Sequence, residues 1–81
     1  MIVRRIRVDV GPGIFSMERS VSFEVNGEYY NSIVEAESLK GDELEVHVIA
    51  DRGDNAIVDL PRDTMTTGNR ILVPKTMLLP A

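Results

Sequence analysis

The sequence predicts an all-β fold, a small six-stranded antiparallel barrel with one short helical turn near residues 63–67. Apolar side chains recur at every second position in several short segments, as in strands with one buried face. Glycine, asparagine and proline interrupt these segments about every 8 to 12 residues, which is typical of sandwiches and barrels. We expect residues 1–81 to form a single domain, because 81 residues have room for one core.

The first expected strand covers residues 2–10, where apolar and polar positions alternate. Its expected inward side carries Ile2, Ile6, Val8 and Val10. Arg4 falls on the same side, so either it lies beyond the edge of the sheet or its guanidinium is paired. The segment 11–13, Gly-Pro-Gly, ends the strand, since proline has no N–H to donate and glycine permits a sharp reversal.

The loop that follows, residues 11–19, carries two large apolar residues, Ile14 and Phe15. Two alternatives are open for them. Either they fold back and plug one end of the barrel, or they are exposed as a binding tip.

The segment 20–39 is the clearest hairpin of the chain. Apolar residues alternate over 21–25, and Asn26-Gly27 follows, which suits a two-residue type I′ turn because both central residues need a positive φ. A turn of this length also fixes the register of the two strands. The expected cross-strand pairs are Val25 with Glu28, Phe23 with Tyr30, and Val21 with Ser32.

Two more expected strands, 44–51 and 56–60, form a second hairpin across the polar turn 51–55. Residues 61–68 have room for one helical turn, with Asp63 as its N-cap and Gly68 as its left-handed end. A last short strand covers 70–73, and the apolar tail 75–79 is expected to dock on another part of the protein. We prefer a closed barrel to an open sheet because closure removes unpaired edges. The resemblance to SH3-like or OB-like barrels is architectural, without a family motif.

Composition narrows the class of protein. The chain has no cysteine, which excludes disulfides and thiolate metal sites, and no apolar run approaches the roughly 18 residues of a membrane span. The N-terminus lacks the apolar region of a signal peptide. We therefore expect a cytoplasmic protein that does not insert into membranes.

The net charge is −4, with basic ends around an acidic middle. Residues 21–59 contain ten acids against Lys40 and Arg52, so we expect the terminal strands to pair with the central ones through opposite charges. The alternative is a nucleic-acid module, which would use Arg4, Arg5, Arg7, Arg52, Arg62 and Arg70. Nucleic acid is an unlikely partner, because the exposed Tyr29 that could stack on a base has acidic neighbours.

No pattern of residues indicates catalysis. His47 is the only histidine, and it lies on the expected outward side of its strand beside Glu45. The paired carboxylates fall at outward positions or in turns, where water surrounds them, so we expect no catalytic residue, metal or cofactor. A small hydrolase or metal-dependent enzyme is the least favoured alternative.

The best candidate for a binding surface is the face opposite the expected core. Strict alternation places four large apolar residues there, Tyr29, Ile33, Ile49 and Ile57. A register shift at a bulge, the chain's own tail or loop, or another chain would have to cover them. We therefore expect a non-catalytic module that binds a protein partner, with a homodimer as one possibility and the loop residues Ile14 and Phe15 as a second candidate contact.

Overall fold

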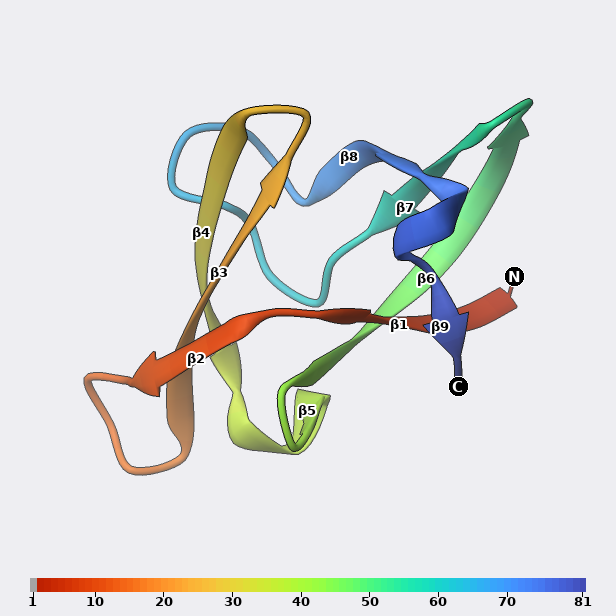
Figure 1. The fold of residues 1–81 in the computed structure, drawn as a ribbon. Coiled ribbons are helices and arrows are strands. Elements are labelled where there is room, and N and C mark those ends of the chain that lie inside the picture. Colours follow the sequence, from red (N-terminus) through yellow and green to blue (C-terminus); the bar gives the residue numbers. More distant parts are fainter. Residues whose placement is uncertain (1) are drawn as a thin grey trace.

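The computed structural model describes residues 2–81, which form nine β-strands in two sheets (Figure 1). The strands are β1 (Ile2–Arg7), β2 (Asp9–Pro12), β3 (Glu18–Val25), β4 (Glu28–Glu35), β5 (Leu39–Lys40), β6 (Glu43–Arg52), β7 (Asn55–Asp59), β8 (Arg70–Pro74) and β9 (Leu79–Pro80). Two short 3₁₀ segments, η1 (Ala36–Ser38) and η2 (Lys75–Met77), are the only helical elements in this range. Neither segment is long and apolar enough to span a bilayer. The prediction of an all-β fold is confirmed.

All strand pairs in both sheets are antiparallel. The six-stranded sheet has the order β8-β7-β6-β1-β9, with β5 attached to β6, and the three-stranded sheet has the order β2-β3-β4. One buried core lies between the sheets and draws on β1, β3, β4, β6, β7 and β8. Phe23 and Val46 are 4% and 1% exposed, so the inward faces of these two strands agree with the predicted alternation.

The expected first strand, 2–10, is divided between the two sheets. Val8 separates β1 from β2, and its N–H donates to the carbonyl oxygen of Asp42 at 2.8 Å instead of to a ladder partner. The chain therefore leaves β6 and continues beside β3. Ile6 and Val8 are buried as predicted, but Ile2 and Val10, which lie at the two ends of this long strand, are exposed.

The β3–β4 hairpin confirms the predicted register throughout. Asn26 and Gly27 both have a positive φ, 50° and 89°, as a type I′ turn requires. Phe23 and Tyr30 stack with ring centroids 5.5 Å apart. The local turn chemistry therefore fixes the longest strand pair of the smaller sheet.

The strands form two sheets and do not close into a barrel, so the predicted closure is not confirmed. On one side the sheets are joined by the continuous run from β1 to β2. On the other side the only strand-like link within 2–81 is an isolated bridge between Ser32 of β4 and Thr64 in the β7–β8 connection. The Ser32 hydroxyl adds a hydrogen bond of 2.7 Å to the carbonyl oxygen of Asp63.

The prediction of a helical turn near residues 63–67 is wrong, because this segment is irregular. The connection is irregular because the N–H groups that a helix would pair internally have other acceptors. The N–H of Met65 donates to Asn31 of β4 at 2.9 Å, and the N–H of Thr67 donates to the Thr64 hydroxyl at 3.0 Å. Asp63 caps no helix, and Gly68 does not have the left-handed conformation expected of it.

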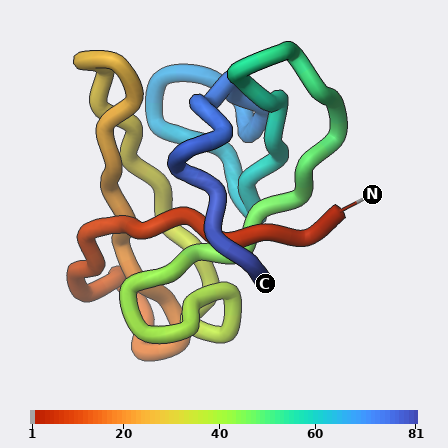
Figure 2. The backbone as a smooth tube through the Cα atoms, turned by 45° about the vertical axis from the view of Figure 1, so that its right-hand side comes forward, coloured from red at the N-terminus to blue at the C-terminus, as the bar shows by residue number. Residues whose placement is uncertain are grey.

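The C-terminal segment docks on the six-stranded sheet, as expected of the apolar tail. β9 pairs with Arg4 and Arg5 of β1, while Met77 and Leu78 pack against the core. In Figure 2 this segment, coloured blue, runs down to the red N-terminal strand.

Opposite charges also face each other between terminal and central strands. The guanidinium of Arg7 lies 3.6 Å from the Glu43 carboxylate, and Arg70 forms two hydrogen bonds, of 2.8 and 3.1 Å, with Asp59. These contacts confirm the predicted pairing of the basic ends with the acidic middle.

Candidate interaction site

The connection between β2 and β3 exposes three large apolar side chains at one end of the molecule. Ile14 is 82% exposed, Phe15 68% and Met17 73%. We call these three residues the apolar tip. Of the two alternatives for Ile14 and Phe15, the structure therefore has the exposed one, and the loop does not plug the core.

Backbone hydrogen bonds hold the apolar tip in place. The N–H of Glu18 donates to the carbonyl oxygen of Phe15 at 3.0 Å, and the N–H of Ala36 donates to that of Met17 at 2.8 Å. The Arg19 guanidinium donates to the carbonyl oxygens of Ser16 and Glu18, at 2.8 and 2.7 Å. The backbone of the loop is thus tied both to itself and to the chain just beyond β4.

Close packing beneath the tip adds to this order. A Cβ atom added to Gly13 would lie 2.5 Å from the carbonyl carbon of Glu18, far inside ordinary contact. Only glycine allows the two strands to approach this closely at the base of the loop. The loop therefore has a closely packed base with a fixed backbone, and its apolar side chains are exposed to water.

A concavity lined mainly by apolar side chains lies at the opposite end of the molecule. We call it the apolar hollow; its volume is about 800 Å³. It is lined by Ile2, Arg4, Val48, Ile49, Ala50, Asp51, Ala56, Lys75 and Leu78. A register shift between Val48 and Ala50 marks a bulge in β6 at this point, and the docked tail supplies one wall. Concave apolar sites with a few polar groups are the usual form of binding sites.

Charged groups stand at the rim of the hollow. Lys75 donates to Asp51 at 2.8 Å, and this hydrogen bond, with that from the Gly53 N–H, lowers the pKa of the Asp51 carboxyl. The guanidinium of Arg4 is half-buried and donates to the carbonyl oxygen of Val3 at 2.9 Å. Among residues 2–81 no carboxylate lies within ion-pair distance of Arg4, so neither explanation proposed for its inward position holds.

The four residues predicted to share an outer face are not brought together. Tyr29 and Ile33 lie on β4 of the smaller sheet, whereas Ile49 and Ile57 lie on β6 and β7 of the larger one. Because the core lies between the sheets, their outer faces look in different directions. Ile49 is at the bulge and lines the hollow, and Ile57 lies beside Leu72 in a shallow depression. Tyr29 is the one member of the four that is exposed, whereas the other three are half-buried.

The arginines of the nucleic-acid alternative are spread over the surface and partly engaged. Arg7 and Arg70 face the acids described above, and Arg62 lies 3.5 Å from Glu35 and 3.9 Å from Glu18. The Arg52 guanidinium donates to the carbonyl oxygen of Asp51, and Arg5 lies opposite Glu45 on β6. The arrangement gives no continuous basic stripe.

His47 lies on β6 with its side chain 45% exposed, and its Nε2 atom is 3.9 Å from the Glu45 carboxylate, beyond hydrogen-bond reach. Within residues 2–81 no group of three or more histidine, aspartate and glutamate side chains is placed to hold a metal ion.

Sequence reasoning missed two parts of the site. Met17 belongs to the same exposed loop as Ile14 and Phe15. Its place in the same predicted loop, two residues after Phe15, could have identified it as a third candidate contact. Apart from Ile49, the hollow left no signal in the sequence, because its lining combines the N-terminal strand, the β6–β7 hairpin and the C-terminal tail.

Comparisons with protein-family models, with curated proteins and with solved structures found no match.

Proposed function

We propose that this protein is a non-catalytic binding or assembly module whose contact with a protein partner is made by the apolar tip. The observation that carries the proposal is an ordered loop with Ile14, Phe15 and Met17 exposed together. Single exposed apolar residues are common on protein surfaces, but a cluster on one loop is typical of an interaction site.

The free energy gained by burying the apolar tip favours this interpretation. Full burial of an isoleucine, phenylalanine or methionine side chain is worth about 1.5–3 kcal/mol. A partner that covered all three would gain a large part of the binding energy of a typical complex from one loop. Because hydrogen bonds already hold the loop, little further ordering is required on binding.

The remaining parts of the proposal concern architecture and location. We interpret the fold as an opened small barrel, since the β1–β2 run and the Ser32–Thr64 bridge join the two sheets at opposite sides. A cytoplasmic location fits a chain without cysteine. The nucleic-acid alternative receives less support, because Arg7, Arg62 and Arg70 already face acids.

Photo-crosslinking from the tip tests the proposed contact. Phe15 is replaced by p-benzoylphenylalanine in the otherwise intact chain, which is produced at its native level in its own cells. Tyr29, which is 66% exposed and also aromatic, is replaced in the same way as the matched control. We expect illumination to join a protein to position 15 and not to position 29, and the added change Ile14→Ser to weaken the product. Equal products at both positions, or none at 15, would refute the proposal.

A further inference from the structure

We propose that the apolar tip of one copy inserts into the apolar hollow of a second copy, which gives a head-to-tail assembly. This inference rests on the proposed function, because it assigns the protein partner of the tip to the same chain. The hollow is thereby assigned as the receiving site.

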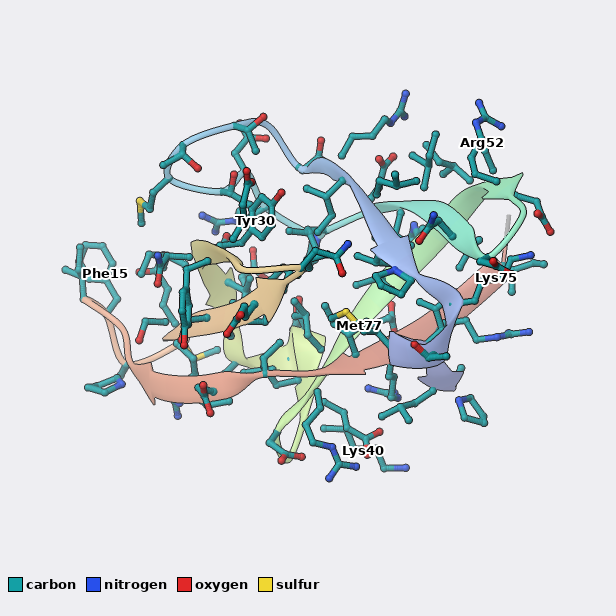
Figure 3. All side chains as sticks on the ribbon, turned by 45° about the horizontal axis from the view of Figure 1, so that its top comes forward. Phe15, Tyr30, Lys40, Arg52, Lys75 and Met77 are labelled. Carbon is teal, nitrogen blue, oxygen red and sulfur yellow. The ribbon has the colours of Figure 1, made fainter. Side chains whose placement is uncertain are left out.

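The positions of the two features exclude a contact within one molecule. The longest dimension of the protein is 38 Å, and Figure 3 shows Phe15 at one end and Lys75, at the rim of the hollow, at the other. The tip therefore reaches a hollow only in another copy. Figure 1 gives the same arrangement, with the β2–β3 loop and the N-terminal end of β1 on opposite sides.

The two features are complementary in shape and polarity. The tip projects two aliphatic side chains and one aromatic ring from a loop whose backbone is fixed. The hollow has a volume of about 800 Å³ and is floored by isoleucine, valine, alanine and leucine side chains. Insertion removes both apolar surfaces from water in a single contact.

Charges at the two ends are also complementary. Glu18, Glu35 and Glu37 lie around Phe15 and Met17 together with Arg62, and Arg19 lies beside Ile14 and Phe15. Acidic side chains therefore outnumber basic ones at the tip by three to two. In residues 2–81 no cation lies within ion-pair distance of Glu37.

The rim of the hollow has the opposite balance. Arg4 and Lys75 stand there against Asp51, and Arg52 follows directly in the chain. Among the residues that the structure describes, the guanidinium groups of Arg4 and Arg52 donate only to carbonyl oxygens of adjacent residues, so both are available to a carboxylate of another chain. This difference in charge favours contact of a tip with a hollow over contact between two tips, because acids outnumber cations at each tip.

This contact joins different surfaces of the two copies. Each added copy brings one free tip and one free hollow, so assembly continues into an open chain or closes into a ring. A two-fold dimer, in contrast, joins identical surfaces and stops at two copies.

Complementary variants distinguish the two arrangements. Phe15→Ser removes the tip and leaves the hollow, while Ile49→Glu disables the hollow and leaves the tip. Arg4→Glu is a second hollow variant, which replaces Ile49→Glu if that chain fails to fold by circular dichroism. Sedimentation velocity is measured for the wild type, for each variant and for equimolar mixtures, from micromolar to millimolar concentration.

We expect the wild-type mass to rise at least twofold with concentration and each variant alone to remain at 9.0 kDa. The mixture of a tip variant with a hollow variant should stop at twice that mass, because it retains one intact contact. A hollow variant that assembles alone, a mixture that stays monomeric, or a wild type that stays monomeric at millimolar concentration would overturn the head-to-tail contact. A monomeric wild type whose tip still crosslinks another protein would leave the proposed function standing.

Discussion

Replacing Gly13 by alanine tests whether the apolar tip is held by close packing at its base. The added Cβ would lie 2.5, 2.6 and 2.7 Å from the carbonyl carbon, carbonyl oxygen and Cβ of Glu18, where 3.4–4 Å is ordinary contact. Glu18 cannot give way easily, because its backbone pairs with Glu35 and its N–H donates to Phe15. The loop or the start of β3 must therefore shift.

The expected cost follows from two opposing effects. Forcing an extra methyl group into a close contact costs about 1–3 kcal/mol. Alanine also restricts the unfolded chain, which returns about 0.4–1 kcal/mol. The midpoints of the two ranges give a net loss of about 1.3 kcal/mol, which lowers the melting temperature of a domain of this size by about 5–10 °C.

Gly68→Ala is the matched control, since nothing lies within 4 Å of its Cβ position and its φ is not in the left-handed region. This variant should be unchanged or more stable by up to about 1 kcal/mol. Both changes are compared by urea denaturation and thermal unfolding. Equal stability of the two variants would refute the close packing inferred at the base of the tip.

Three further predictions follow from the same structure. Ser32→Ala removes the hydrogen bond to the Asp63 carbonyl oxygen and should lower the free energy of unfolding, measured by urea denaturation, by about 1 kcal/mol. An unchanged free energy of unfolding would mean that the link between β4 and the β7–β8 connection contributes little to stability. Asp51→Asn should reduce stability at neutral pH, because the lowered pKa of Asp51 makes its carboxylate stabilising above its ordinary 3.8. The difference from wild type should shrink as the pH falls below 3.8, and a difference that stays constant over the whole acid range would contradict this origin. A gel shift with mixed RNA at low salt should give no complex, and a complex that weakens steeply with salt would revive the nucleic-acid alternative.

Local features of the fold were predictable from the sequence where one short segment determines the outcome. The register of β3 and β4 depends on the two turn residues Asn26 and Gly27, and this dipeptide can be recognised in the sequence without knowledge of any distant contact. The exposed loop was one of two alternatives, because Ile14 and Phe15 follow a strand that must reverse. Whether such a loop folds back depends on room in the core, which local patterns do not record.

Predictions failed where distant segments decide the structure. Residues 63–67 have the composition of a capped helical turn, but Thr64 bridges Ser32 and the N–H of Met65 donates to β4. The prediction of a shared outer face failed for a similar reason. Alternation alone places Ile49 outward, whereas the bulge in β6 brings it to the hollow. The hollow also depends on distant segments, because Lys75 and Leu78 of the docked tail complete its lining.

Accessibility of the Ile14 methyl groups to a soluble paramagnetic agent, followed by NMR over a range of protein concentrations, tests the central claim most directly. Ile6, which is fully buried, is the internal reference. We predict strong relaxation of Ile14 in dilute protein, a marked fall in that relaxation as the concentration rises, and no change at Ile6. An Ile14 signal already protected in dilute protein, or equally exposed at every concentration, would contradict the account of the tip as a contact between copies.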